Sequence, residues 1–567
     1  MGVHEFADEA LRNFLSWEPL GASVLGLHDL GLDGELSDWS EEGAEEQRAG
    51  IQRLRARLHE EFDPDDLPLQ ERVTWDMLDR ELHERRESLD AAMEEFAVAP
   101  FFVGAQAQLL QFIPKTQTPR ADLAEARLER LAGIPRMLRQ AAERLRAGVV
   151  KGRTPAARAA RGAISQIEGY LASDLDGDIL VGEPPVGLDD PGGWQARAEA
   201  IVGDQVRPAM SRFRDHVRDV VLPAGRADDR AGLVHLPDGE RLYAVAARHA
   251  TSTDRTPDEI HQLGRDLIDR LDDEYAVIAP TVLGTADREA ILRRMREDRE
   301  LCYGTREEMV ADGEKAIRAA SAEAPAWFGR TPAEDCVVRR VGAFEEATAP
   351  PAYYTPPATD GSRPGVYWIN TYEPQTRQRY LSESIAFHEA VPGHHFQIAL
   401  AQNLDGLPLY RRVSSINAYA EGWGLYAERL ADEMGLYSSQ LMRLGMLATD
   451  SWRACRLVVD TGLHHLGWSR QQAVDWMGAN SPVERGTIEV EVDRYIAMPG
   501  QALGYMVGRI EIVALREEAQ RRLGDRFDIR GFHDTVLGSG SLPLTTLRLV
   551  VEAWIDRIVT TQPARRA

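Results

Sequence analysis

The stretch HEAVPGHHFQ, residues 388–397, begins like a metal-binding helix but departs from the usual spacing. The common motif is H-E-x-x-H, in which two His residues one helical turn apart bind the same ion. Here the position four after His388 is Pro392, and the next His residues are His394 and His395. The sequence therefore raises a geometric question, namely which of these two residues could share a metal with His388.

A regular helix would exclude both. Each residue turns by about 100° and rises by about 1.5 Å, so His394 would point about 120° away from His388. His395 would lie about 10.5 Å along the axis. However, Pro392 cannot bond the carbonyl of His388, and Gly393 permits almost any backbone turn. A two-residue bulge at Pro392–Gly393 would place His394 at an effective i+4 position, so we expect His394 rather than His395 to be the second ligand.

A carboxylate from the next helical segment is expected to complete the site. The segment INAYAEGWGLYAERLADEMG spans residues 416–435, and Glu421 follows His394 by 27 residues, enough for a loop and a returning helix. Gly422 and Gly424 would let a second helix approach closely. Glu428, two turns further on the same face, is the alternative ligand, or it orients a ligand from behind. We favour Glu421, which with His388 and His394 would hold one Zn²⁺ and leave a fourth position open.

Glu389 directly follows the first His and is the candidate catalytic base. In sites of this kind the Glu after the first His is not a ligand. It removes a proton from the metal-bound water and passes it to the leaving amine. The pattern therefore predicts hydrolysis.

Composition and charge exclude several other classes of function. The chain has 567 residues and a formal net charge of −25, which disfavours binding to nucleic acid or to an anionic membrane surface. Its three cysteines are far apart and form no disulfide framework. No apolar run reaches the roughly 18 residues of a membrane span, and the first residues do not resemble a signal peptide. We expect a cytoplasmic protein.

Hydrophobic periodicity predicts a mainly helical chain. Amphipathic helices are expected over 41–62 and 121–150, and a further helix over 256–275 is predicted to be capped by Thr256. Short strands are expected over 240–252, 336–341 and 365–371, with a Pro-rich loop before the last one. We divide the chain into an N-terminal helical region, 1–238, and a metal-site catalytic region, 239–567, which together form one continuous catalytic unit.

Several longer stretches resemble a bacterial family catalogued as a domain of unknown function. They are HEAVPGHHFQ, AYAEGWGLYAE (418–428), DTGLHHLGWS (460–469), EVDRYIAMPGQALGY (491–505), LPDG, TPDEIHQLG and AYYTPPATDGSRPGVYWINT. The resemblance covers most of the chain. The family in turn is similar to the mainly helical gluzincin-type zinc peptidases, such as thimet oligopeptidase and angiotensin-converting enzyme.

This resemblance implies a large helical peptidase-like fold, with a small antiparallel sheet beside the metal-site helix and a deep cleft. It implies zinc-dependent hydrolysis of peptide bonds in short peptides. A donor for the developing oxyanion would come from downstream, where Tyr505 and His464 are the candidates. Arg494 and Tyr495 could bind substrate, and Arg494 could grip a carboxylate. The strand at 365–371 could pair with an extended peptide as an edge strand, with Asn370 and Tyr354 lining the cleft.

Two other functions use the same residues. Two His and one carboxylate also form the ligand set of non-haem iron oxygenases, although those enzymes need no base at the position of Glu389. A non-catalytic helical binding protein could also retain the pocket.

Overall fold

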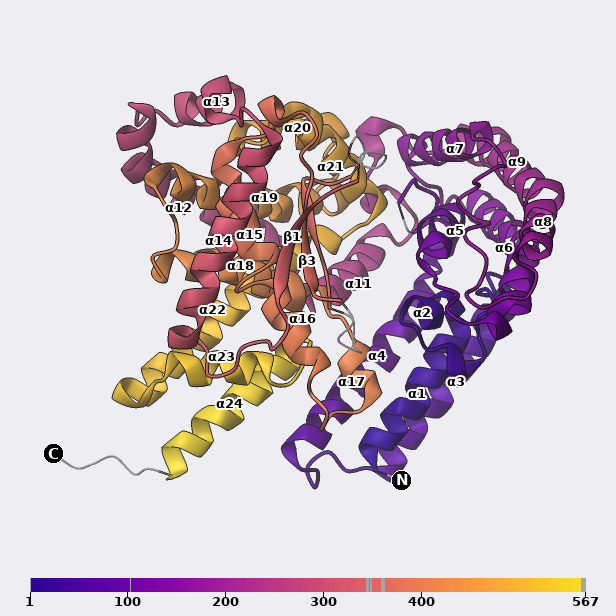
Figure 1. Ribbon diagram of the computed structural model, residues 1–567, viewed down its shortest axis with the longest axis horizontal. Helices are drawn as coiled ribbons and strands as arrows, with labels where there is room; N and C mark the ends of the chain where they lie inside the picture. The colour runs from indigo at the N-terminus through magenta and orange to yellow at the C-terminus, as the bar shows by residue number, and fades with distance from the viewer. Residues whose placement is uncertain (1, 102, 343–345, 347–348, 358–362, 562–567) are drawn as a thin grey trace.

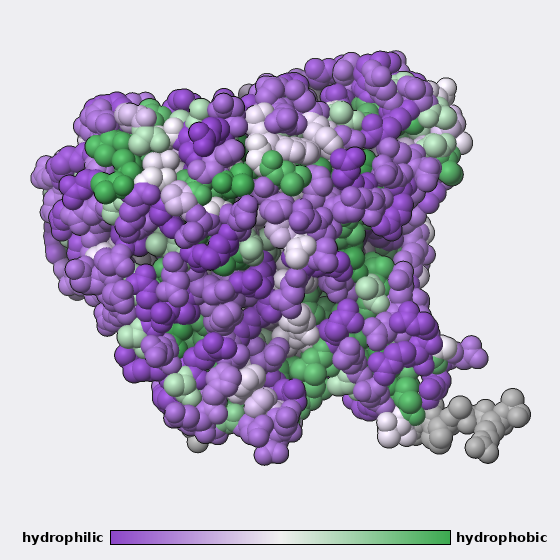
Figure 2. All heavy atoms as spheres, turned by 180° about the vertical axis from the view of Figure 1, so that it is seen from behind, coloured by the Kyte–Doolittle hydropathy of each residue, from purple (hydrophilic) through white to green (hydrophobic). Residues whose placement is uncertain are grey.

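The computed structural model describes residues 2–101, 103–342, 346, 349–357 and 363–561. Within these ranges the fold is mainly helical, as the sequence predicts, with one small sheet (Figure 1). None of the helices described there is both long and apolar enough to cross a membrane. The face shown in Figure 2 is largely hydrophilic, in agreement with the 28% of charged residues in the sequence.

The first part of the chain consists of packed helices, and the two amphipathic segments expected there are confirmed. The helices are α1 (Val3–Trp17), α2 (Pro19–Val24), α3 (Glu41–Glu61), α4 (Leu69–Ala91), α5 (Ala105–Phe112), α6 (Ala124–Val150), α7 (Ala157–Ala172), α8 (Pro191–Ile201), α9 (Arg207–His216) and α10 (Leu222–Ala224).

The strand expected over 240–252 is wrong, because this segment forms α11 (Gly239–Thr251). Its buried residues Gly239, Leu242 and Tyr243 recur at three and four, which is the spacing of a helix face. The next helix begins as predicted, with the Thr256 side chain accepting a hydrogen bond from the backbone of Glu259. The helices that follow are α12 (Pro257–Leu283), α13 (Arg288–Glu297) and α14 (Arg306–Trp327).

The sheet contains the two strands predicted before the motif and one more. The strands are β1 (Cys336–Arg340), β2 (Ala352–Thr355) and β3 (Gly365–Ile369), in the order β1-β3-β2. β3 pairs in parallel with β1 and antiparallel with β2, so the sheet is mixed and not purely antiparallel as expected. β2 forms within the Pro-rich loop, where it is tolerated because it lies at an edge.

β3 is the central strand, so the expectation that it offers a free edge to a peptide is wrong. Both of its edges are occupied by β1 and β2. Of the two edge strands, β2 contacts the helix that carries His388.

The rest of the chain is helical again, as predicted. It comprises α15 (Ser382–Glu389), α16 (His394–Gln402), α17 (Leu409–Val413), α18 (Asn417–Glu433), α19 (Gln440–His464), α20 (Arg470–Asn480), α21 (Arg485–Ala497), α22 (Gly504–Leu523), α23 (Ile529–Leu537) and α24 (Leu544–Thr561).

Two apolar cores hold these elements together. One contains side chains of α5 to α9, the group at the upper right of Figure 1. The other joins α1, α3 and α4 to the helices and the sheet that follow residue 230. A cavity of about 680 Å³ lies between α1, α4 and the segment that leads into α18. The first helices therefore help to build the surroundings of α18.

α18 and α22 cross closely, and this crossing depends on glycine. A Cβ atom at Gly508 would lie 1.8 Å from the backbone oxygen of Ala418, and one at Gly422 would lie 2.5 Å from Gly508. The prediction that Gly422 lets a second helix approach is confirmed. The crossing fixes the helix that carries Glu421.

Gly508→Ala is expected to lower the free energy of unfolding by about 1–3 kcal/mol or more, because the added methyl group overlaps backbone that cannot easily move. Gly169→Ala in α7 is the matched control, since no atom lies within 4 Å of its added Cβ. The control should be neutral or stabilising by up to about 1 kcal/mol. Urea unfolding measures both, and equal midpoints would contradict the role of the crossing.

Candidate metal centre

The helix carrying HEAVPGHHFQ is interrupted between the two His residues expected to bind metal. α15 ends at Glu389 and α16 begins at His394, so the break spans Ala390–Gly393 and is wider than the predicted two-residue bulge. Ala390 (φ −109°, ψ −105°) and Gly393 (φ −78°, ψ −126°) both leave the helical region. The interruption removes the constraint of regular helical spacing.

The break is compact and is held by its own hydrogen bonds. The backbone N–H of His395 donates to the oxygen of Ala390 at 3.1 Å. The indole N–H of Trp423 in α18 donates to the oxygen of Pro392 at 2.9 Å. A Cβ atom at Gly393 would lie 1.9 Å from the oxygen of His388, so only glycine fits there. The packing therefore fixes the orientation of α16.

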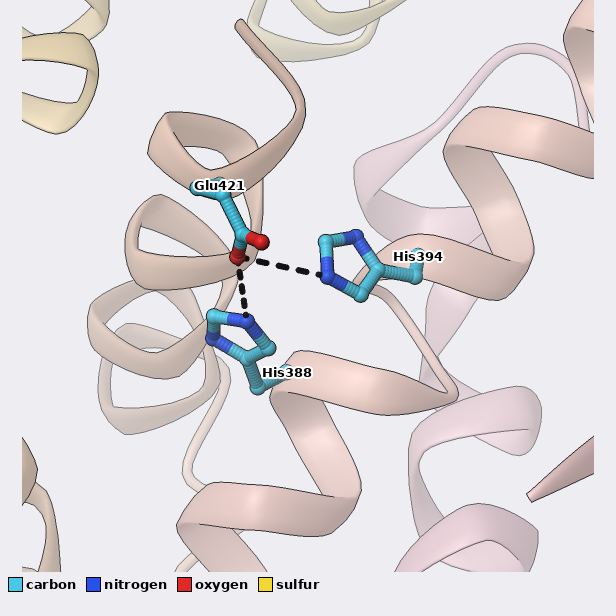
Figure 3. Close-up of side chains that lie close together, drawn as sticks. All are labelled: His388, His394 and Glu421. Carbon is cyan, nitrogen blue, oxygen red and sulfur yellow. Dashed lines mark hydrogen bonds and ion pairs between the residues drawn. The ribbon is translucent and has the colours of Figure 1, made fainter. Parts of the chain in front are cut away.

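His388, His394 and Glu421 come together at this break (Figure 3). Glu421 Oε2 lies 3.3 Å from His388 Nε2 and 3.6 Å from His394 Nε2. Ligand atoms bound tetrahedrally to zinc at about 2.0–2.1 Å are separated by roughly 3.3 Å. The two contacts therefore match the edges of a zinc coordination sphere.

The cluster is buried on one side and accessible on the other. The side chain of His388 is 5% exposed, whereas those of His394 and Glu421 keep 13% and 22% of their surface. A closed structural zinc site has four protein ligands, whereas three converge here among the described residues and part of their surface remains open. This arrangement leaves room for a water molecule or a substrate atom.

Glu428 orients His388 from behind, as the sequence suggested. His388 Nδ1 donates to Glu428 Oε1 at 2.8 Å, and the hydroxyls of Ser384 and Thr449 donate to the other carboxylate oxygen. Such a carboxylate fixes the ring so that Nε2 faces the metal. Gly424 makes room for the ring, because a Cβ atom there would lie 2.6 Å from His388 Cε1.

The charges of the cluster also fit a cation. Burial alone would lower the pKa of His388, yet its contacts with Glu421 and Glu428 raise the pKa to about 9. Burial likewise opposes ionisation of Glu421, but the contacts with His388 and His394 hold its pKa well below the usual range. The protons on His388 thus satisfy the buried carboxylate of Glu428 and the half-buried one of Glu421, and a divalent cation could replace the proton on Nε2.

His395 lies outside the cluster. Its Nε2 donates to the backbone oxygen of Glu334 at 3.0 Å, and its Nδ1 accepts from the hydroxyl of Tyr354 at 2.8 Å. Burial lowers the pKa of His395, so the ring is neutral. Tyr354, predicted to line the cleft, therefore links β2 to α16.

Glu389 is half-buried at the end of α15, next to the candidate ligand His388. Burial raises the pKa of its carboxyl, while the positive charges of His394 and His388 act in the opposite direction. A carboxylate with a raised pKa beside a candidate metal site is suited to accept a proton near neutral pH.

The predicted oxyanion donors occupy different environments. Burial is the main cause that raises the pKa of Tyr505 to about 12, and the negative charge of nearby Glu421 acts in the same direction. The guanidinium carbon of Arg456 lies 4.4 Å from the centre of the Tyr505 ring. Its hydroxyl makes no hydrogen bond to the described residues and remains available. His464 is fully buried, with Nδ1 accepting from the N–H of Leu233 and Nε2 donating to the oxygen of Tyr495. It has no free nitrogen for a substrate.

The other predicted substrate-binding residues are engaged within the protein. Arg494 pairs with Glu491 at 2.9 Å and also bonds Gln501, and the buried Tyr495 donates to Glu491 at 2.7 Å. Asn370 is fully buried and donates to two backbone oxygens of the loop between β1 and β2, and it also lines a cavity beside α15. These contacts support the fold around the cluster.

The sequence analysis missed Arg453 of α19. Its charge acts on Glu389, on Glu428 and on Tyr505, which places it close to the cluster. Its guanidinium donates a long hydrogen bond of 3.5 Å to the backbone oxygen of Thr449, and no carboxylate among the described residues pairs with it. The sequence feature that could have indicated this role is a row of polar residues three or four positions apart in a mostly apolar helix, namely Thr449, Arg453 and Arg456.

The fold and the cluster together define a mainly helical protein with a His₂Glu candidate metal centre. The chain belongs to the family described as "Bacterial protein of unknown function (DUF885)", which it matches over residues 19–551. It is similar to the crystal structure of a "putative lipoprotein" from Colwellia psychrerythraea, with 27% identity, a TM-score of 0.87 and coverage of 98% of this chain and 99% of that chain.

A second solved structure shares the fold. It is a "putative lipoprotein of unknown function" from Shewanella oneidensis, with 20% identity, a TM-score of 0.77 and coverage of 97% of this chain and 100% of that chain. No curated protein matches the chain.

His394→Ala should weaken zinc binding by more than about 100-fold, beyond the 10–100-fold typical of outer partners. His395→Ala should retain zinc, although the loss of its two hydrogen bonds lowers stability. Zinc content after dialysis against a zinc buffer measures both. Retention by the His394 variant together with loss by the folded His395 variant would contradict the assignment.

Proposed function

We propose that this protein is a zinc-dependent hydrolase of peptide bonds in short peptides. The observation that carries the proposal is the convergence of His388, His394 and Glu421, with Glu389 directly after the first ligand. When bound, zinc would supply a Lewis acid that lowers the pKa of an attached water to about 7. The His388–Glu389 pair on α15 and Glu421 on α18 also support the proposed likeness to gluzincin peptidases.

The protein residues have distinct roles in this proposal. Glu389 accepts a proton from the attacking water and donates it to the departing amine, because its half-buried carboxyl has a raised pKa. Tyr505 lies on the Glu421 side and presents a free hydroxyl that could donate to the developing oxyanion. Glu428 holds His388 in place and does not itself contact the substrate. Arg453 is available to attract a carboxylate of the substrate.

An extended peptide could reach these groups along the sheet. β2, rather than β3, is the edge strand that contacts α15, so its backbone is the better candidate for pairing with a substrate. Such pairing would place the peptide backbone beside Glu389 without requiring a particular side chain.

The compartment stays a prediction. The three cysteines are free, which favours the reducing cytoplasm expected from the sequence. The names of the two similar structures favour a location outside it. Fractionation of the native host would decide between them.

Glu389→Gln should reduce kcat by about 10²–10⁴-fold, because an amide cannot accept the proton. Zinc content should stay the same, since Glu389 is not a ligand. Glu383→Gln on the same helix is the matched control, because its side chain only accepts a hydrogen bond from the N–H of Ser438. Cleavage of a mixed peptide library, followed by mass spectrometry, measures the activity. The proposal would be contradicted if the Glu389 variant, or the chelator-treated protein, still cleaved peptides at the wild-type rate. An activity that iron restores and that depends on oxygen would instead indicate the non-haem iron alternative.

Tyr505→Phe should lower kcat by about 10²–10³-fold with little change in KM, the usual effect of losing one oxyanion donor. Tyr419→Phe on α18 is the matched control, because its hydroxyl is buried and donates to the backbone oxygen of Val536. The two variants are compared in steady-state kinetics on the same peptide. A loss no greater than that of the control would remove Tyr505 from the mechanism.

A further inference from the structure

A separate cavity of about 190 Å³ lies beside the helix that carries His388 and Glu389. Ile385 of α15 forms one wall, Tyr367 and Ile369 of β3 form another, and Ala448 and Trp452 of α19 form a third. These elements are neighbours in the fold, since α15 packs directly on α19 (Figure 1). The cavity therefore lies where the sheet, the metal-site helix and α19 meet.

Each of the three walls contains a residue that is linked to the candidate site by sequence spacing or by a contact. Ile385 precedes Glu389 by four residues, one helical turn or about 6 Å along α15. Tyr367 lies opposite Tyr354 of β2, whose hydroxyl donates to His395, the residue after the candidate ligand His394. Trp452 lies under Arg453, whose guanidinium is 4.9 Å from the indole centre. The cavity thus lies one helical turn from Glu389 along α15.

Apolar side chains cover most of the lining area, and polar side chains such as Asn370, Gln378 and Thr487 also face the cavity. Met309, Gly313, Leu381 and Val483 contribute to it in addition to the walls described above. Arg377 and Glu484 also lie along it, and the carboxylate of Glu484 is near enough to act on Arg377. An apolar cavity of about 150 Å³ is enough to bind benzene. The volume here can therefore take a phenyl ring or a large branched side chain.

We propose that this cavity binds a large apolar or aromatic side chain of the peptide substrate, next to the bond that is cleaved. The proposal rests on the proposed function, because it assigns the cavity as the specificity pocket of that same site. Burial of the side chain would hold the adjacent peptide bond beside Glu389. The preferred substrate class is then peptides with Phe, Leu or a similar residue at this position.

The expected result is a preference of about tenfold or more in kcat/KM for Phe or Leu over Ala at one position next to the cleaved bond, the range that one apolar pocket provides. Ala448→Leu fills the cavity and should reduce this ratio towards one. Ile385→Ala enlarges the cavity and should shift preference towards Trp. Ala196→Leu, at an exposed position of α8, makes the same chemical change away from the site and is the matched control.

These ratios are measured in a peptide library that varies each position around the cleaved bond. A wild-type enzyme without side-chain preference would overturn the proposal. So would folded variants at Ala448 and Ile385 that both keep the wild-type ratios. Using two variants with opposite expected shifts keeps the test decisive if one of them does not fold.

Binding separates this proposal from the proposed function. Ligand-observed NMR with N-acetyl-phenylalanine amide detects occupation of the cavity without any cleavage. The pocket is supported, even if no peptide is cleaved, when the wild type and the Ala196 variant bind N-acetyl-phenylalanine amide and the Ala448→Leu variant does not. Equal signals in all three proteins would overturn the pocket, whereas absence of cleavage with selective binding would overturn only the peptidase activity.

Discussion

The hydrogen bond between His388 and the buried carboxylate of Glu428 is the interaction on which the candidate metal centre depends. Glu428 is fully buried, and an unpaired charge there would cost several kcal/mol. Its partners come from α15 through Ser384 and His388, and from α19 through Thr449. One carboxylate of α18 therefore ties three helices together and sets the direction of the His388 ring.

The interruption between α15 and α16 follows from this constraint. With His388 fixed by Glu428, the second His can reach Glu421 only if the chain leaves the helix after Glu389. Gly393 permits the close return of the backbone, and Trp423 holds the oxygen of Pro392. Gly424 leaves space for the His388 ring, and the close contact between Gly422 and Gly508 holds α18 in place. Both contacts help to keep Glu421 and His388 in position. Small residues are therefore concentrated where helices must approach the cluster.

Much of this could be predicted from local sequence. The helical periodicity, the capping by Thr256 and the strands around 336 and 365 depend on neighbouring residues, and the structure has them. The spacing also indicated the cluster of His388, His394 and Glu421, because two His residues and a carboxylate needed only a break and a returning helix. The sheet order could not be read in this way, since pairing joins strands that are distant in sequence.

The same limitation explains the residues that the sequence placed differently. His464 carries a reactive-looking group, but long-range packing engages both of its ring nitrogens with backbone partners. Conversely, Arg453 looks like an ordinary helix charge until α19 is placed against α15 and α18. The segment 240–252 alternated enough to suggest a strand, yet its buried residues match a helix once it packs in the core.

Residues of α19 contact several parts of the candidate site and hold them at fixed relative positions. Along this helix, Thr449 supports Glu428, Trp452 lines the apolar cavity, Arg453 approaches Glu389, and Arg456 covers Tyr505. These positions recur at three and four, so they share one face. Because the helix is buried along most of its length, none of them can shift without disturbing the others. A side chain that fills the cavity would therefore press on the same rigid face that aligns the metal ligands, which couples substrate recognition to the geometry of the proposed reaction.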